Sequence, residues 1–270
     1  ILKKVSKYNL TVRTLPTLGD IAKGRIKAED LIFLEIDDLL GREKVMPNQD
    51  LMMKNIKNKT VLVTGAGGSI GSQICREVLK IKPKKLLILD SNEYSLYSIL
   101  NNLDSLNHIN HIEIIPLLAS VQDGVKINKV LNTWKPQTIY HAAAYKHVPI
   151  VEHNLAEGVK NNVFGTLTIA KAALDKGVSD FVFISTDKAV RPTNVMGATK
   201  RLGEICLQAL FDSKDVKKTT KFSMVRFGNV LDSSGSVIPK FKKQIDERKP
   251  LTLTHPEITR FFMTIKEASE

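Results

Sequence analysis

The sequence predicts an α/β fold with a doubly wound parallel sheet and a small C-terminal substrate lobe. Short apolar runs alternate with stretches of helical periodicity from residue 60 onward, and a glycine-rich turn joins the first run to the first helix. Strands that alternate with helices need crossover connections, which make the strands parallel and cover both faces of the sheet. The 270 residues suffice for one such domain and a lobe.

The predicted strands are short and apolar, as expected of strands buried on both faces. They span residues 60–64, 86–90, 112–115, 138–140, 181–184 and 222–226. Helical patterns start at residue 70 and cover about 96–103, about 155–176 and about 196–211. Strand and helix therefore alternate until about residue 226, where we expect the lobe to begin.

Residues 1–57 show no clear periodicity. We expect them to form the tail of a preceding domain and a linker, and residues 58–270 to form the α/β domain with its interleaved lobe. Because the chain starts at Ile1 and stops inside a regular pattern, we also expect a fragment whose lobe is partly missing.

The composition narrows the range of partners. The net charge is +12, but the lysines are spread along the chain with only one tryptophan, so a solvated basic surface explains the charge better than a membrane or nucleic acid. Two distant cysteines indicate a reducing compartment, and six scattered histidines lack metal-binding spacing, so we expect no metal. No apolar run reaches 18 residues, so we expect these residues to be soluble and cytoplasmic.

The first turn has the features of a dinucleotide-binding loop. Residues 64–71 read Thr-Gly-Ala-Gly-Gly-Ser-Ile-Gly between a strand and a helix, a context that strengthens a weak glycine pattern. Small residues let the backbone approach a pyrophosphate, and the helix N-terminus offers free N–H groups. Asp90 ends the second strand, where an acid binds the adenosine ribose and favours NAD over NADP. The predicted cofactor residues of this Rossmann-type domain are Gly65, Gly67, Gly68, Ser69, Ile70, Gly71 and Asp90.

A second polar stretch, residues 185–200, follows the fifth strand. It reads Ser-Thr-Asp-Lys-Ala-Val-Arg-Pro-Thr-Asn-Val-Met-Gly-Ala-Thr-Lys and starts at the carboxyl end of a strand, where open α/β sheets bind ligands. Its acid and its two lysines suggest a reaction centre, although an ordinary polar loop could have the same composition.

Four segments carry more specific patterns: the glycine loop, His-Ala-Ala-Ala at 141–144, Asn-Val-Phe-Gly-Thr at 162–166, and residues 187–201. Together they resemble the extended short-chain dehydrogenases/reductases, in particular the polysaccharide-biosynthesis (CapD-like) nucleotide-sugar dehydratases. The resemblance covers most of residues 58–270. It implies the catalytic domain of a membrane-anchored bacterial UDP-N-acetylglucosamine 4,6-dehydratase.

The resemblance also implies roles for individual residues. Most members of the superfamily have a tyrosine four residues before the lysine, where this chain has Met196, which cannot transfer a proton. Either the chain is a silent NAD-binding module, or Asp187 acts as general acid and Lys188 as base. The implied catalytic residues are Thr186, Asp187, Lys188, Met196 and Lys200, with Lys200 also on the nicotinamide ribose; Ala142 and Ala143 join the cofactor residues.

Six residues are implied to bind the substrate: Ser185, Lys146, Asn162, Arg226, Asn229 and Arg260. Arg226 and Asn229 resemble the segment that contacts the UDP part, and Arg260 could bind a phosphate. A surface ion pair explains Arg260 nearly as well. Asp232 stands where the family usually has glycine.

The implied reaction is a redox-neutral dehydration of a UDP-N-acetylhexosamine for surface glycan synthesis. Hydride leaves sugar carbon 4 for NAD⁺, a base removes the carbon 5 proton while the carbon 6 hydroxyl leaves as water, and the hydride returns to carbon 6. A nucleotide-sugar 4-epimerase and a silent binding module remain alternatives. We expect NAD, a UDP-sugar, a homo-oligomer and no nucleic acid. We expect the full-length protein at the cytoplasmic face of the inner membrane, held only through a region N-terminal to this chain.

Overall fold

The structure is a computed structural model that describes residues 13–14, 32–33, 46–107, 112–213, 220–233, 235–253 and 255–270. The chain divides into two compact units, Ile1–Glu43 and Lys44–Glu270. In the first unit, β1 (Arg13–Thr14) pairs antiparallel with β2 (Ile32–Phe33). The second unit begins earlier than the expected residue 58, because α3 (Gln49–Ile56) packs Ile56 into its core.

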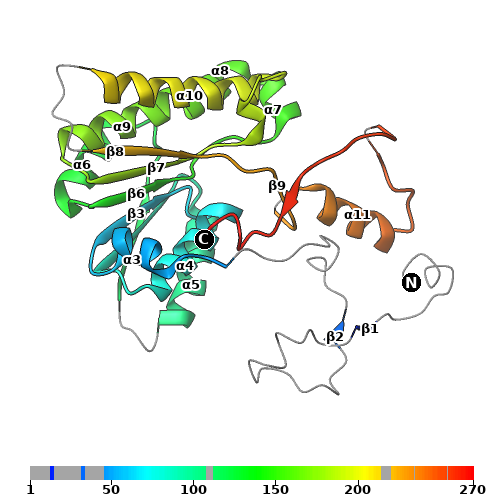
Figure 1. Cartoon of the computed structure of the whole chain (residues 1–270), viewed down its shortest axis with the longest axis horizontal. Helices are drawn as coiled ribbons and strands as arrows, with labels where there is room; N and C mark the ends of the chain where they lie inside the picture. The colour runs from blue at the N-terminus through cyan, green and yellow to red at the C-terminus, as the bar shows by residue number, and fades with distance from the viewer. Residues whose placement is uncertain are drawn as a thin grey trace. The chain divides into compact units, whose positions relative to one another are not determined.

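Among the described residues of the second unit, six strands form one parallel sheet in the order β5-β4-β3-β6-β7-β8 (Figure 1). They are β3 (Thr60–Thr64), β4 (Lys85–Asp90), β5 (Glu113–Leu118), β6 (Thr138–His141), β7 (Asp180–Ile184) and β8 (Lys221–Val225). The predicted parallel, doubly wound sheet is confirmed. The strand order reverses between β3 and β6, so their carboxyl ends flank the switch point where such sheets bind ligands.

Helices cover both faces of the sheet (Figure 1). One face carries α3, α4 (Ser69–Lys80) and α5 (Glu93–Asn107), which pack with Val61 and Val63 of β3. The other face carries α6 (Gly124–Trp134), α9 (Thr166–Asp175) and α10 (Val195–Asp212), which pack with Leu62. Because β3 feeds alternate side chains into two apolar clusters, all of its residues are buried.

The helix expected over residues 155–176 is divided in the structure. It consists of α8 (Leu155–Val159), a π-helix (Lys160–Gly165) and α9. Among the described residues, four helices have no counterpart among the predicted ones: α3, α6, α7 (Val148–His153) and α11 (Val237–Asp246). The sequence does carry a start signal for α6, since the side chain of Asp123 accepts a hydrogen bond from the N–H of Lys126 at 2.9 Å.

The C-terminal segment follows β8. In it, β9 (Asn229–Val230) pairs in parallel with β10 (Phe262–Met263), and α11 (Val237–Asp246) lies between them in the sequence. No residue of α11 is buried. Asp232 has a φ of 59°, the left-handed conformation that glycine favours and that aspartate tolerates better than most residues.

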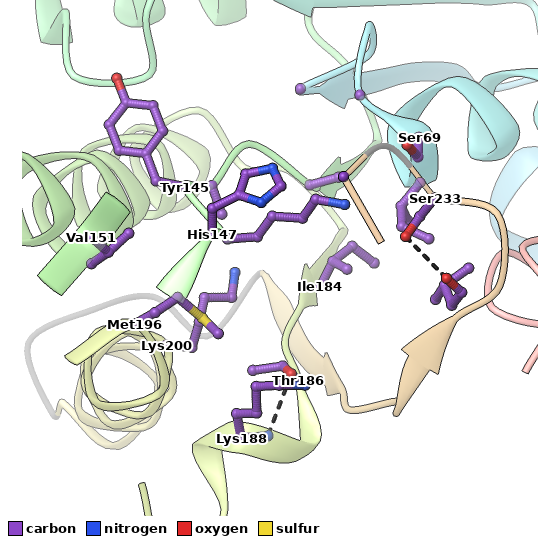
Figure 2. A pocket seen from close by; sticks show the side chains of 18 of the residues that line it. Ser69, Tyr145, His147, Val151, Ile184, Thr186, Lys188, Met196, Lys200 and Ser233 are labelled. Atoms are coloured by element: carbon purple, nitrogen blue, oxygen red, sulfur yellow. Dashed lines mark hydrogen bonds between the residues drawn. The ribbon is translucent and has the colours of Figure 1, made fainter. Parts of the chain in front are cut away.

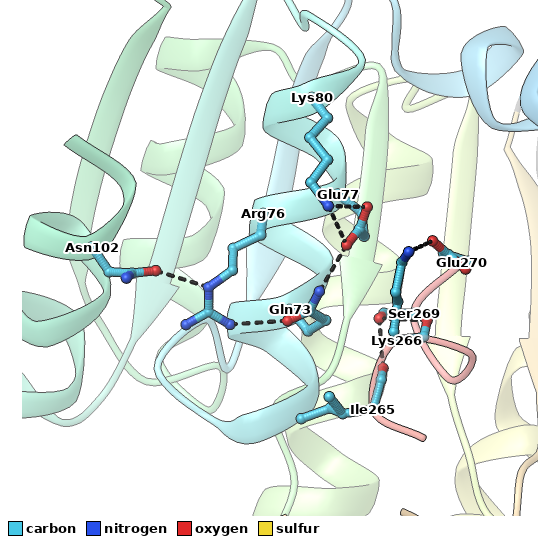
Figure 3. A network of polar contacts seen from close by, with 9 residues as sticks. All are labelled: Gln73, Arg76, Glu77, Lys80, Asn102, Ile265, Lys266, Ser269 and Glu270. Atoms are coloured by element: carbon cyan, nitrogen blue, oxygen red, sulfur yellow. Dashed lines mark hydrogen bonds and ion pairs between the residues drawn. The ribbon is translucent and has the colours of Figure 1, made fainter. Parts of the chain in front are cut away.

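The last residues return to the domain beside α4 (Figure 3). Ser269 and Glu270 line a small cavity of about 260 Å³ together with Glu77 of α4. Glu77 is buried, and its carboxylate pairs with Lys80 at 2.8 Å and accepts a hydrogen bond from Gln73 at 2.7 Å. In the part of the chain that the structure describes, we find no helix with the length and apolar character needed to cross a bilayer.

Candidate active site

A cavity of about 750 Å³ lies at the carboxyl ends of β3, β6 and β7, next to the switch point of the sheet (Figure 2). This volume is typical of sites for small molecules. The predicted site residues in its wall are Gly65, Gly68, Ser69, Ile70, Gly71, Ala142, Lys146, Ser185, Thr186, Lys188, Met196, Lys200 and Asn229. Residues from the glycine-rich loop to β9 therefore meet around one space.

The glycine-rich loop approaches its neighbours too closely for side chains. Gly65 has a φ of 64°, and a Cβ there would lie 2.7 Å from the Cα of Ala143 in the loop after β6. A Cβ on Gly71 would lie 2.0 Å from the carbonyl oxygen of Gly65, so α4 can start this close to β3 only with glycine at 71. Gly68 is the N-cap of α4, whose N-terminal N–H groups and dipole suit a phosphate.

Asp90 ends β4, and its carboxylate holds the glycine-rich loop through hydrogen bonds. Its Oδ2 accepts a hydrogen bond from the N–H of Gly67 at 2.9 Å, and its Oδ1 accepts one from the N–H of Asn92 at 2.9 Å. A carboxylate can accept about four hydrogen bonds, so Asp90 keeps capacity for the hydroxyls of a ribose. The loop and the acid together fit a dinucleotide.

His141 ends β6 and is a buried structural residue. Its Nδ1 lies 2.7 Å from Oγ1 of Thr64, and its Nε2 lies 2.9 Å from Oγ1 of Thr166. The hydroxyl of Thr166 donates to the carbonyl of Asn162, so Nε2 must carry the proton and Nδ1 must accept from Thr64. Burial lowers the pKa of His141 to about 3. A neutral ring therefore anchors the start of the loop after β6.

Asn162 lies in the π-helix and clamps the same loop. Its Oδ1 accepts a hydrogen bond from the N–H of Tyr145 at 2.8 Å, and its Nδ2 donates to the carbonyl of Tyr145 at 2.9 Å. Asn162 is fully buried and is not in the cavity wall. Its contacts instead position the loop that carries Lys146, which lines the cavity and whose pKa is lowered by partial burial.

The predicted acid and base form a hydrogen-bonded pair. Asp187–Ala189 is a short 3₁₀-helix after β7, with Thr186 as its N-cap. The hydroxyl of Thr186 donates to Oδ1 of Asp187 at 3.0 Å, and Nζ of Lys188 contacts the same oxygen at 3.1 Å. Thr186 and Lys188 line the cavity, and Asp187 adjoins it through these two bonds.

Two further contacts hold Lys188. On β9, Oδ1 of Asn229 accepts a hydrogen bond from Nζ of Lys188 at 3.2 Å. Gly197, in the first turn of α10, lies against the backbone of Lys188, since a Cβ on Gly197 would be 2.3 Å from the carbonyl oxygen of Lys188. The lysine is therefore positioned by its side chain through β9 and by its backbone through α10.

The first turns of α10 bring Met196 and Lys200 to the cavity (Figure 2). Met196 is buried and cannot transfer a proton. Lys200 is 5% exposed, and its Nζ lies 4.0 Å from the centroid of the Phe183 ring. Burial lowers the pKa of Lys200 to about 7, and the negative charge of Glu204 opposes this shift.

Glu204, one turn beyond Lys200, is not among the predicted site residues. It is fully buried and accepts hydrogen bonds from Ser185 at 2.6 Å, from Nε of Arg226 at 2.8 Å and from Arg201 at 3.0 Å. Burial alone would raise the pKa of Glu204, but hydrogen bonds from Arg226, Ser185 and Arg201 outweigh it and lower the pKa to about 2. Its spacing of four residues from Lys200 on a helix was the available signal.

Arg226 and Arg260, both predicted to bind the substrate, lie outside the cavity wall. Arg226 is engaged by Glu204 through Nε and Nη2. Arg260 is exposed, and its Nη1 donates to the carbonyl of Thr259 at 2.9 Å. The other predicted site residues that do not line the cavity are Gly67, Asp90, Ala143, Asp187 and Asn162.

The parallel sheet, the glycine loop at its switch point and the buried lysine on the helix after β7 together define a Rossmann-type protein of the short-chain dehydrogenase/reductase class. Solved structures of similar fold agree; Pen from Bacillus thuringiensis matches with a TM-score of 0.74 and 35% identity, over 80% of this chain and 66% of that chain. Within the class, the chain belongs to the polysaccharide biosynthesis protein family, whose model matches residues 61–270.

Curated relatives have names from the same field. The capsular polysaccharide biosynthesis protein CapD of Staphylococcus aureus is 51% identical over 255 residues, which are 94% of this chain and 42% of that protein. The UDP-N-acetylglucosamine 4,6-dehydratase (inverting) of Campylobacter jejuni is 33% identical over 211 residues, which are 77% of this chain and 60% of that protein. The chain therefore spans less than half the length of CapD.

Proposed function

We propose that this chain is the catalytic domain of an NAD-dependent, redox-neutral 4,6-dehydratase that acts on UDP-N-acetylglucosamine or a related UDP-N-acetylhexosamine in surface polysaccharide synthesis. The observation that carries the proposal is the hydrogen-bonded series Thr186, Asp187 and Lys188, beside the cavity that the glycine-rich loop also lines. The similarity to a protein named as a UDP-N-acetylglucosamine 4,6-dehydratase supports it.

The glycine-rich loop and Asp90 fit NAD. The loop has no side chain where a Cβ would collide with backbone, and the N-terminus of α4 faces the same cavity, so a pyrophosphate could lie against it. The carboxylate of Asp90 favours NAD over NADP, because a 2′-phosphate would meet a like charge. Lys200 would hold the nicotinamide ribose. When bound, NAD⁺ would accept a hydride from sugar carbon 4 and return it to carbon 6.

Thr186 can pass a proton in place of the missing tyrosine. Thr186 lines the cavity, and its hydroxyl donates to Oδ1 of Asp187 at 3.0 Å. When the sugar alcohol at carbon 4 becomes a ketone, its proton can move to Thr186 while Thr186 gives its own proton to Asp187. The inert Met196 is then compatible with catalysis, and Asp187 becomes the carboxylic acid that the next step needs.

The elimination uses the two charged residues together. Lys188, as a neutral amine, removes the proton from carbon 5, while Asp187 gives its proton to the carbon 6 hydroxyl, which leaves as water. Lys188 then returns a proton to carbon 5, so the pair ends as it began, a carboxylate beside an amine. Each positioned acid or base contributes about 10²–10⁴-fold to the rate.

The substrate assignment rests on charge and shape. Lys146 lines the cavity, has no part in the proposed chemistry, and can pair with the diphosphate of a nucleotide sugar. The volume of about 750 Å³ suits small ligands. Because Asn229 and Ser236 of the C-terminal segment line part of the cavity wall, we propose that the UDP portion extends toward β9 and α11.

Heavy water distinguishes the candidate activities. Full-length protein is incubated with UDP-N-acetylglucosamine and NAD⁺ in heavy water, and the products are analysed by mass spectrometry. A dehydratase gives a product that has lost one water and carries deuterium at carbon 5. An isomer of unchanged mass would indicate a 4-epimerase instead. No conversion by protein that still binds NAD⁺ would indicate a silent module and contradict the proposal.

We also propose a homo-oligomer and a location at the cytoplasmic face of the inner membrane for the full-length protein. Light scattering of the purified protein tests the first, and fractionation of cells tests the second. Recovery of a monomer, or of the full-length protein outside the membrane fraction, would overturn the corresponding prediction.

A further inference from the structure

The carboxylate of Glu204 joins three segments around the candidate site. Ser185 follows β7, Arg226 follows β8, and Arg201 lies on α10 with Glu204 itself; all three donate to the same buried carboxylate. We propose that Glu204 is a positioning residue that fixes Ser185 as a hydrogen-bond acceptor toward the substrate and holds α10 against the ends of β7 and β8. The proposal rests on the proposed function for the identity of the substrate.

The direction of the bond between Ser185 and Glu204 follows from the donor count. A carboxylate has no proton to give, and a serine hydroxyl has one, so Ser185 must donate across the 2.6 Å contact. With its proton committed to Glu204, the hydroxyl of Ser185 can form further hydrogen bonds only as an acceptor, through its lone pairs. Since Ser185 lines the cavity, it can only accept there, from a sugar hydroxyl or another donor. Without Glu204 the hydroxyl could rotate and offer its proton instead.

Glu204 has no acceptor capacity left for other partners. Oε1 receives Ser185 and Nε of Arg226, and Oε2 receives Nη2 of Arg226 and Nη1 of Arg201. Four bonds are about the limit of a carboxylate. A glutamine at this position has the same shape, but its NH₂ group would face an arginine donor. The isosteric variant therefore breaks the arrangement without leaving a cavity.

The position of Glu204 links this arrangement to Lys200. The two residues are four apart on α10, and both are at most 5% exposed. The bonds from Ser185 and Arg226, which lie outside α10, fix the rotation and depth of this turn of the helix, from which Lys200 also projects toward the cavity. A change at Glu204 should therefore alter the geometry of reacting groups more than the affinity for UDP, whose proposed contacts lie on other elements.

The test compares Glu204→Gln with a matched control in the full-length enzyme. Arg201→Ala removes one bond to Glu204 and leaves those from Ser185 and Arg226. We expect Glu204→Gln to lower kcat about 30-fold with KM for the UDP-sugar within about 3-fold, and Arg201→Ala to change kcat less than about 3-fold. Glu204→Asp, which keeps the charge, should recover about half of the loss on a logarithmic scale.

A double-mutant cycle with Ser185→Ala tests the mechanism. Ser185→Ala should lower kcat about 10-fold in the wild type and less than about 2-fold in the Glu204→Gln background, because the oriented hydroxyl is already lost there. Additive effects, or a wild-type kcat for Glu204→Gln, would overturn the proposal. If Glu204→Gln does not fold, the same cycle is made with Glu204→Asp, where additivity again decides against it.

The same cycle can be measured without turnover, as binding of UDP-N-acetylglucosamine to protein loaded with NADH, where we expect a coupling of about 2- to 3-fold in affinity. If Ser185 and Glu204 are coupled in binding but the enzyme does not dehydrate the sugar, the proposed function is wrong and the role of Glu204 stands. If the enzyme dehydrates the sugar normally but neither measurement shows coupling, the role of Glu204 is wrong and the proposed function stands.

Discussion

The two halves of the cavity are built in different ways. The cofactor half is shaped by missing side chains, since a Cβ on Gly65 or Gly71 would meet backbone atoms at 2.7 and 2.0 Å. The sugar half is shaped by polar side chains that form hydrogen bonds with one another. Two of them are partly exposed: the side chain of Asp187 is 39% exposed and that of Lys188 is 31% exposed. Changes in the first half should therefore alter dinucleotide affinity and stability, whereas changes in the second should alter chemistry on an intact fold.

The largest effect is expected in the sugar half, for Lys188→Ala. Removal of the proposed base should lower kcat about 10³-fold or more, because the proton on carbon 5 loses its acceptor. The affinity for NAD⁺, measured by titration calorimetry, should stay within about 2-fold, because the glycine-rich loop does not depend on Lys188. Retained turnover would remove Lys188 from the mechanism, and lost NAD⁺ binding would show that the halves are not separable.

The free energy of unfolding should depend on pH through His141, the buried residue that ends β6. Its folded pKa of about 3 lies below the ordinary value of 6.5, so between these values the unfolded state binds a proton that the folded state does not. Stability from this residue is present above pH 6.5 and is lost as the pH falls. The free energy of unfolding, from urea titrations, should decrease by roughly 2 to 3 kcal/mol between pH 7 and pH 4.5.

His141→Gln provides the control for this pH dependence. The variant should be less stable at pH 7, because the two threonine hydroxyls lose their buried partner. Its stability should change less over the same pH interval. An equally steep decrease in the variant would assign the effect to other groups. Glu204, with a folded pKa of about 2, adds stability above its ordinary pKa of 4.5, and this stability is lost only as the pH falls below that value.

In the cofactor half, Gly71→Ala should weaken NAD⁺ binding and destabilise the fold by about 1–3 kcal/mol, the usual cost of overpacking. The added Cβ would lie 2.0 Å from the carbonyl oxygen of Gly65, so β3 and α4 must separate. Thermal unfolding and NAD⁺ titration measure the two effects. Gly124→Ala is the matched control, because Gly124 is outside the cavity wall and its Cβ would meet only Cγ2 of Thr168 at an ordinary 3.5 Å. Equal losses of NAD⁺ affinity and stability in both variants would show that the close contact between Gly71 and Gly65 is not the cause.

Gly197→Ala applies the same perturbation to the sugar half. Its Cβ would lie 2.3 Å from the carbonyl oxygen of Lys188, so the turn that carries Asp187 and Lys188 must shift. We expect kcat to fall about 10-fold, as a displacement of about 1 Å can cost more than this, with NAD⁺ affinity unchanged. Gly124→Ala, where the nearest contact is an ordinary 3.5 Å, should leave kcat as it is. A drop in NAD⁺ affinity for Gly197→Ala would weaken the division into halves.

The smallest effect is expected for Met196→Leu. Both side chains are apolar and similar in volume, and the proposed proton path runs through Thr186, so kcat should change less than about 3-fold in a steady-state assay. Thr186→Val is the informative partner, since it keeps the shape and removes the hydroxyl. Its kcat should fall at least about 10-fold. Equal activity of Thr186→Val and wild type would exclude the relay.

The cofactor half could be predicted from sequence because its determinants are local. The strand, the loop over residues 64–71 and the helix are consecutive, and glycine reports a backbone requirement directly. The partners in the sugar half are distant along the chain: Ser185 and Glu204 are 19 residues apart, and Lys188 and Asn229 are 41 apart. No periodicity relates such positions, so only the folded sheet shows that Arg226 faces Glu204.

The helices illustrate the same limit. The apolar period over 155–176 predicts helix, but it does not reveal the π-helix that turns Asn162 toward the backbone of Tyr145. Likewise, α3 looks like part of a linker until Ile56 is seen against the sheet. In both cases tertiary contacts override a weak local pattern.

The pairing of β9 with β10 has a consequence for synthesis on the ribosome. Asn229, which holds Lys188, lies on a two-residue strand whose partner is Phe262–Met263, some thirty residues later. The six-stranded sheet is complete once β8 has emerged, at Val225. A nascent chain should therefore form its dinucleotide site first, and Asn229 should hold Lys188 only after β10 has left the exit tunnel. Chains released before that point would bind the cofactor without being able to use it.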